Sequence, residues 1–166
     1  MTSISHEIYY RTAQYIKDTS AAEYEEKLDG IKALHDRGGF TITNIHCDNE
    51  FHKTMDSFAP KHDPPIKVNF ASAREHVPQA ERNNWKIQEW IQSTYCHLPF
   101  NHLPRIMIKY VVMESCKEIN FYPAKHGVLK YFSPRMILYQ ENIDCNRVDD
   151  CRTGSATCMW KKRAAQ

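Results

Sequence analysis

The chain has 166 residues, 42% hydrophobic and 25% charged, a balance typical of one folded globular domain rather than a disordered chain. Its net charge of +2 permits contact with nucleic acid without requiring it, because strongly phosphate-binding domains usually carry a denser basic stripe. The mean hydropathy is −0.64 and no apolar run is as long as a membrane span, so we expect no membrane partner.

The first half of the chain predicts alternating strands and helices. Residues 4–10 form a short candidate strand. A capping-box pattern at Ser20 and Glu23 begins a helix, and the Gly-Gly pair at 38–39 ends it. Residues 40–46 are rich in β-branched and aromatic side chains, which favours a strand. The order helix, Gly-Gly, strand is typical of an α/β layered domain.

The second half predicts one more strand and two longer helices. Residues 52–65 are polar and end in two prolines, so we expect a surface connection there. Residues 66–70 read as a strand, and a helix is expected from about Ala80 to Tyr95. The next helix, residues 105–120, is apolar nearly all round, and we expect it to be well buried.

Three segments follow from this pattern. Residues 1–122 form the main α/β domain, residues 123–144 a loop-rich extension with a short helix, and residues 145–166 a weakly ordered tail. Six cysteines without a Cys-x-x-Cys pair, and no secretory signal in the first residues, predict reduced thiols in an intracellular protein.

Two carboxylates stand at positions where catalytic groups collect in α/β proteins. Asp48 follows a predicted strand, and Glu81 lies in the first turn of a predicted helix. If the chain brings them together, a cation such as Mg²⁺ would relieve their repulsion. The alternative is structural, with Asp48 stabilising a turn and Glu81 the dipole of its helix.

The sequence around these acids resembles a known family. The strings IHCDNEF and AREHVPQAERNNWKIQ resemble the catalytic region of integrases from copia-type retrotransposons. The segment RTAQYIKDTSAAEYEEKLDGIKALHDRGGF resembles the helix and Gly turn that come before, and LPFNHLPRIMIKYVVMESCKEINFYPAKHGVLKYFSPRMILY the closing helices. In the latter, Asn120, Pro123 and the step from Ser133 to Pro134 match the family's pattern.

The resemblance implies a fold, a reaction and a site. The fold would be a ribonuclease-H-like integrase core with C-terminal helices, and the reaction metal-dependent strand transfer during DNA integration. Asp48 corresponds to the family's second acid and Glu81 to its third, so both would hold Mg²⁺ or Mn²⁺. By helical periodicity, Arg82 and Lys86 flank the Glu81 face of the same helix, where they would contact the DNA backbone or simply form a solvated helix surface. A nuclear location is expected on the same ground.

The chain departs from the family at the first acid. That residue is expected on an opening strand before the segment matching MTSISHEIYY, and the chain starts after it, so we expect an incomplete, truncated core. Within residues 1–10 only Glu7 is acidic, and Glu50 is a further possible substitute. Such a core is expected to be inactive alone, marginally stable and prone to self-association.

Metal and nucleophile sites of other kinds are less well supported. The close pairing of ligands that zinc sites use is not seen around His46, His52 and His62 or among the C-terminal cysteines.

Two alternatives to an integrase fragment stay open. One is a non-catalytic nucleic-acid-binding or oligomerising remnant of the same origin, and the other an unrelated α/β protein with structural carboxylates.

Overall fold

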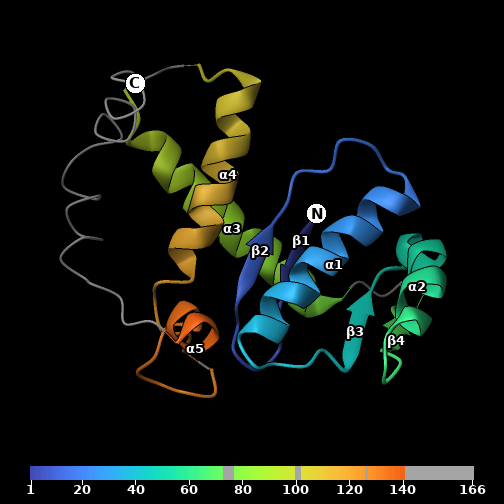
Figure 1. Ribbon diagram of the computed structural model, residues 1–166. Helices are drawn as coiled ribbons and strands as arrows, with labels where there is room; N and C mark the ends of the chain where they lie inside the picture. Colours follow the sequence, from blue (N-terminus) through green and yellow to red (C-terminus); the bar gives the residue numbers. More distant parts are fainter. Residues whose placement is uncertain (73–76, 100–101, 126, 141–166) are drawn as a thin grey trace, which may run out of the picture.

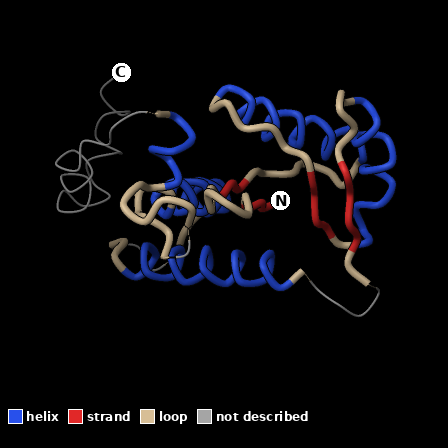
Figure 2. Tube along the Cα trace, turned by 90° about the horizontal axis from the view of Figure 1, so that it is seen from below, coloured by secondary structure: helices blue, strands red, loops and turns tan. Residues whose placement is uncertain are grey.

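The computed structural model describes residues 1–72, 77–99, 102–125 and 127–140, which form a mixed α/β protein. Short strands form two separate two-stranded sheets within this part of the chain, and five α-helices surround them. Helices α1 and α3 lie on opposite sides of the strands (Figures 1 and 2). None of the helices in these ranges is long and apolar enough to cross a membrane.

The first sheet is a hairpin of β1 (Thr2–Ile4) and β2 (Arg11–Ala13), which pair antiparallel. The expected strand over residues 4–10 is therefore wrong, because most of that segment forms the turn. The Ser5 hydroxyl accepts a hydrogen bond from the Tyr10 N–H at 2.9 Å, and Tyr9 adopts a positive φ of 56°. Ser5 thus stabilises the turn between β1 and β2, which the strand-forming residues of this segment do not predict.

Helix α1 (Ala21–Arg37) begins as the capping box predicts. The Ser20 hydroxyl accepts from the Glu23 N–H, and the Glu23 carboxylate reaches back to the N–H groups of Lys17 and Asp18 at 2.7 and 3.1 Å. The helix ends at the Gly-Gly pair, where a Cβ on Gly38 would lie 2.5 Å from the Leu138 carbonyl oxygen. Both ends of the predicted helix are confirmed.

The second sheet pairs β3 (Asn44–Cys47) with β4 (Lys67–Phe70) in parallel. Alternate residues of both strands point inward and pack on one core. Between the strands the chain forms α2 (His52–Phe58), with 3₁₀ turns at Asn49–Phe51 and Ala59–Lys61.

The prediction of a polar surface connection over residues 52–65 is wrong. Met55 and Phe58 of α2 are 2% and 1% exposed and form the centre of the core with Ala59 and Ile66. The Glu25 carboxylate of α1 accepts from Ser57 and pairs with Lys61, which fastens this segment to α1. The many polar residues of the segment form the outer face of an amphipathic helix.

Helices α3 (Pro78–Cys96) and α4 (Arg105–Ile119) pack on each other and on the hairpin. Ile87, Cys116 and Ile119 form the core between them. The expectation that α4 is well buried is wrong on one side, where Ile106 is 62% and Ile108 46% exposed. An apolar composition shows that a helix can be buried all round, but not which of its faces has a partner.

A short helix, α5 (Pro134–Tyr139), closes the described chain. Ser133 caps it by accepting from the Met136 N–H at 3.2 Å, and Leu138 packs with Ile8 and Tyr10 of the hairpin turn. The short helix expected within residues 123–144 is thus present, while the boundary at 122 stays a prediction. The tail expected over 145–166 lies outside the described residues.

Candidate functional site

Asp48 is the first residue after β3 and precedes the 3₁₀ turn Asn49–Phe51. Its backbone carbonyl accepts from the Phe51 N–H at 3.1 Å, but its side chain makes no capping hydrogen bond. The structural alternative gave the carboxylate a role in stabilising this turn. The structure shows the turn formed by the backbone, which leaves the half-buried Asp48 carboxylate available for another partner.

Asp48 also acts on the thiol that precedes it. Burial, and secondly the negative charge of Asp48, raise the pKa of Cys47 to about 11. Cys47 therefore stays protonated at neutral pH and is a poor nucleophile or metal ligand in this state. The chemistry available at the end of β3 is that of a carboxylate, not of a thiolate.

Glu81 lies in the first turn of α3 and is exposed. Pro78 is the first residue of this helix, two residues before the expected start at Ala80, and Val77 precedes it without a side-chain cap. The predicted orientation of α3 is confirmed, because Asn83 and Ile87 are buried while Glu81, Arg82 and Lys86 face outward.

The two acids come from elements that lie on one side of the molecule. Parallel pairing brings the C-terminal ends of β3 and β4 to the same edge of their sheet. The first turn of α3 lies on the side toward which these strands point (Figures 1 and 2). The direct approach of the Asp48 and Glu81 carboxylates stays a prediction.

The cations beside Glu81 differ in how freely they can act. Lys86 pairs with Glu89 one turn further along α3, at 3.3 Å, so part of its charge is already neutralised. Arg82 is exposed in the turn that holds Glu81. Trp85 is 59% exposed on the same side of the helix, whereas Trp90 packs inward and donates to Glu118 at 3.0 Å. Arg82 is therefore the better candidate for a phosphate contact.

The histidines near Asp48 in sequence have other roles. His52 contacts Asp56 at 2.8 Å and stacks on the Phe70 ring at 4.5 Å. His62 packs edge-on against Phe58, with its Nε2 still 4.0 Å from the nearest Asp29 oxygen. Within the described ranges, no group of three or more His, Cys, Asp or Glu residues is arranged to hold a metal ion. The possible substitutes Glu7 and Glu50 are both exposed.

One structural residue gains a clear role that its sequence position did not show. Asn120 is 2% exposed at the end of α4, and its side-chain amide pairs with both backbone groups of Arg11 in β2. It accepts from the Arg11 N–H at 2.8 Å and donates to the Arg11 carbonyl at 2.7 Å. The amide thus occupies the outer edge of the hairpin as a neighbouring strand would.

The described residues form a mixed α/β protein. Its candidate site combines Asp48, which follows β3, with Glu81 and Arg82, which are exposed in the first turn of α3. No protein-family model matches the chain, and a search of the curated proteins finds no match.

Proposed function

We propose that this chain is a fragment of a retroelement integrase with ribonuclease-H-like architecture, and that it contacts DNA where β3 and β4 end. The observation that carries the proposal is the Asp48 carboxylate, which follows the strand and is not used as a turn cap. The first turn of α3, with Glu81 and Arg82, lies on the same side. These elements hold the integrase-like strings of the sequence, in the order that the family uses.

Asp48 and Glu81 would be the residues that hold a divalent cation. Mg²⁺ and Mn²⁺ are hard ions that accept carboxylate oxygens and keep several waters, so two such ligands suffice for weak binding. A bound ion of this kind would activate a nucleophile or stabilise a leaving oxygen on a phosphodiester. Asp48 would orient the ion from the strand edge, and Glu81 from the helix.

Strand transfer is the activity proposed for the parent protein, not for this chain alone. Two-metal catalysis uses a carboxylate that bridges both ions, together with others that each hold one ion. Asp48 and Glu81 supply two such groups. Lacking a bridging carboxylate, the site would lose several kcal/mol of transition-state stabilisation, or many powers of ten in rate. The purified chain should therefore neither join nor cleave DNA.

DNA binding is the property that the chain is expected to keep. Arg82 and Lys86 would meet phosphates, so affinity should fall steeply with salt. Replacing both by glutamine should weaken binding to duplex DNA and flatten the salt dependence by roughly one unit for each phosphate that the protein no longer neutralises. Lys17→Gln with Arg37→Gln removes the same charge from exposed positions elsewhere and should change both far less.

A strand-transfer assay with Mg²⁺ and with Mn²⁺ tests the catalytic part, with Glu81→Gln as the matched control. No product is expected from either chain. Activity that disappears in the Glu81→Gln variant would overturn the proposed inactivity and point to Glu7 or Glu50 as a third ligand.

The duplex-binding experiment has its own contradicting outcome. Loss of duplex binding in the Lys17→Gln, Arg37→Gln control, but not in the Arg82→Gln, Lys86→Gln variant, would overturn the proposed DNA surface.

A second candidate is a non-catalytic remnant that associates with itself. Ile106, Ile108 and Tyr110 of α4 are between 46% and 62% exposed. A hollow of about 190 Å³ between α4 and the hairpin adjoins Ile108 and has an apolar lining. Sedimentation of the chain and of an Ile106→Glu variant tests this candidate, since a dimer that persists in the variant would contradict the use of this face.

A further inference from the structure

The loop between α4 and α5 presents a row of uncovered apolar side chains. Within residues 128–132 the exposed fractions are 63% for Val128, 45% for Leu129, 82% for Tyr131 and 47% for Phe132. Tyr131 has the largest value among the exposed large hydrophobic side chains of the described chain. A ring that is four-fifths exposed contributes little to folding, so its position calls for a role at the surface.

The charge of this region is of one sign. Residues 119–140 contain two lysines and one arginine and no aspartate or glutamate. The Lys130 ammonium lies 5.8 Å from the centre of the Tyr131 ring, and Lys125 is exposed in the same loop. Glu7, whose carbonyl accepts the Val128 N–H, brings one carboxylate from the hairpin turn and leaves the local balance positive.

The loop is held in place at both ends. The Val128 N–H bonds to the Glu7 carbonyl at 3.3 Å, and Ser133, 1% exposed, caps α5. The Arg135 N–H donates to the buried Asn120 carbonyl at 3.0 Å. A surface that is fixed before binding loses less conformational entropy when a ligand arrives.

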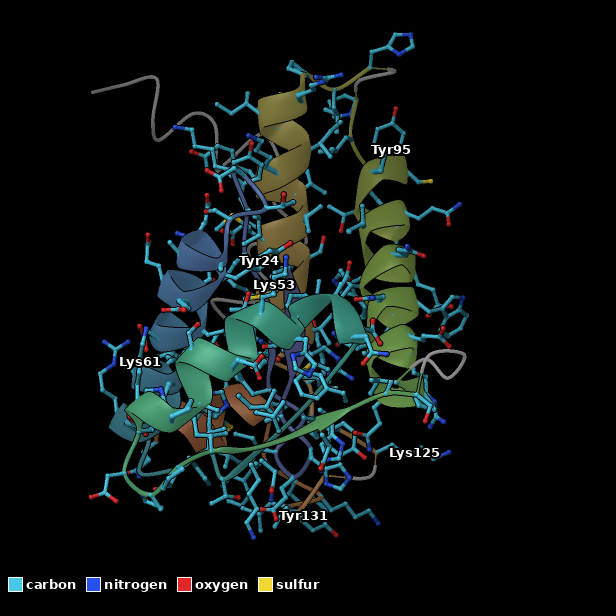
Figure 3. The ribbon with its side chains drawn as sticks, turned by 90° about the vertical axis from the view of Figure 1, so that its right-hand side faces the viewer. Tyr24, Lys53, Lys61, Tyr95, Lys125 and Tyr131 are labelled. Carbon is cyan, nitrogen blue, oxygen red and sulfur yellow. The ribbon has the colours of Figure 1, made fainter. Side chains whose placement is uncertain are left out.

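A further cation–aromatic cluster lies beside the loop. The Arg135 guanidinium is 5.1 Å from the centre of the Phe121 ring and 4.7 Å from that of Tyr139. Figure 3 shows Lys125 and Tyr131 in the lower part of the molecule, below Lys53 on α2. The loop and the start of α5 therefore combine aromatic rings with cations.

We infer that this edge binds single-stranded nucleic acid, with Tyr131 and Phe132 stacking on bases and Lys125 and Lys130 meeting phosphates. Non-specific single-strand binding combines exposed aromatic rings with cations, because every base has a stacking face and every nucleotide a charge. A membrane fits the loop less well. Lys130 lies in the middle of the apolar run, so insertion of Tyr131 would draw an ammonium group toward the acyl chains.

This inference does not need the metal site. It names a second surface, on α4 and α5, whereas the proposed duplex contact uses the start of α3. Binding of a labelled oligo(dT) 20-mer, measured beside binding of a duplex, separates the two, because Tyr131→Ala should weaken the first and leave the second unchanged.

Tyr131→Ala should weaken oligo(dT) binding roughly five- to hundred-fold, the range found when one stacked ring is removed. Tyr131→Phe keeps the ring and should restore the affinity. Lys130→Gln should reduce the salt slope by about 0.7, the value for one phosphate on a single strand. The matched control is Tyr15→Ala, because Tyr15 is 49% exposed and also has a lysine, Lys109, over its ring at 3.4 Å.

The expected pattern is weaker binding in Tyr131→Ala, recovery in Tyr131→Phe and unchanged binding in Tyr15→Ala. Equal affinity of the unmodified chain and Tyr131→Ala would overturn the inference. So would an equal weakening in the Tyr131 and Tyr15 variants. Sedimentation with phosphatidylcholine vesicles containing about 30% phosphatidylserine tests the membrane directly. Vesicle binding that depends on Tyr131, with oligo(dT) binding unchanged, would assign the loop to a lipid surface instead.

Discussion

The two sheets of this protein are completed by different means. In the β3–β4 half, which comprises these two strands and α2, the strands pair with each other and cover a hydrophobic core that contains Phe58 and Ile66. The hairpin half comprises β1, β2 and the helices α3 and α4 that pack on them. There the side-chain amide of Asn120 takes the place of a neighbouring strand on β2. The first half depends on hydrophobic burial, and the second depends more on the placement of single polar groups.

Unpaired polar atoms follow the same division. Of the buried side-chain atoms without a hydrogen-bond partner in the described chain, four lie in the hairpin half, on Arg11, Gln14, Asn83 and Ser115. The β3–β4 half has one, His62 Nε2. The sixth, His35 Nε2, lies on α1, and the His35 ring packs against Tyr10 of the hairpin turn. Since buried polar atoms cost free energy when unpaired, the hairpin half should be the less stable of the two.

The largest effect should come from the core of the β3–β4 half. Phe58→Ala removes a ring that is 1% exposed and should lower the free energy of unfolding by about 3–5 kcal/mol. Urea denaturation measures this change. Tyr131→Ala removes a ring of similar size from the surface and should change stability by less than about 0.5 kcal/mol. A decrease below about 1 kcal/mol for Phe58→Ala would contradict the proposed division.

Asn120→Ala should have the next largest effect. It leaves the N–H and carbonyl of Arg11 without partners at a half-buried edge, at a cost of about 1–3 kcal/mol. Hydrogen exchange locates the change, because the Arg11 amide should exchange much faster while the amides of β3 and β4 keep their protection. Uniform acceleration in both sheets would show that the two halves unfold as one unit.

A thiol in the hairpin half should make stability depend on alkaline pH. Burial raises the pKa of Cys116 from 9.0 to about 11, so folding favours the protonated thiol. Its contribution is fully present below pH 9 and is lost as pH rises through about 11, at most about 3 kcal/mol. Unfolding measured from about pH 8 to about pH 10.5 should show a smaller decline in stability for Cys116→Ala than for the unmodified chain, and an equal decline would contradict this role of the thiol.

The smallest effect should have the opposite sign. Ser115 is 1% exposed and its hydroxyl has no hydrogen-bond partner among the described residues. Ser115→Ala removes this unpaired group with little loss of volume and should raise the free energy of unfolding by up to about 1 kcal/mol. Thermal denaturation would detect the increase. A clear decrease would mean that a partner, such as bound water, satisfies the hydroxyl.

The sequence predicted the elements whose signals are local. The capping box at Ser20, the Gly-Gly pair and the β-branched runs located α1, β3 and β4. It missed α2, although Phe51, Met55 and Phe58 are spaced as on one face of a helix, because the polar residues between them dominate the composition. A short stripe of this kind is only decisive once a partner face is known.

The candidate site, like the fold, was predictable only where its signals are local in the sequence. The orientation of α3 follows from helical periodicity, so the exposure of Glu81 and Arg82 could be predicted. The pairing of Lys86 with Glu89 is also local. The contact of Asn120 with Arg11 joins positions 109 residues apart and has no local signal. The loop between α4 and α5 has one sequence signal, the lack of aspartate and glutamate in residues 119–140. That signal becomes informative only when the exposure of Tyr131 and Phe132 is known.

The central claim is that Asp48 and Glu81 hold one divalent cation between them, and paramagnetic broadening by Mn²⁺ tests it most directly. In ¹⁵N-labelled protein, substoichiometric Mn²⁺ should broaden the amide signals around Asp48 and around Glu81 together, since broadening reports closeness to the ion. In Glu81→Gln both sets should recover, and excess Mg²⁺ should restore them in the unmodified chain. Broadening at only one of the two acids, or broadening unchanged in Glu81→Gln, would contradict the claim.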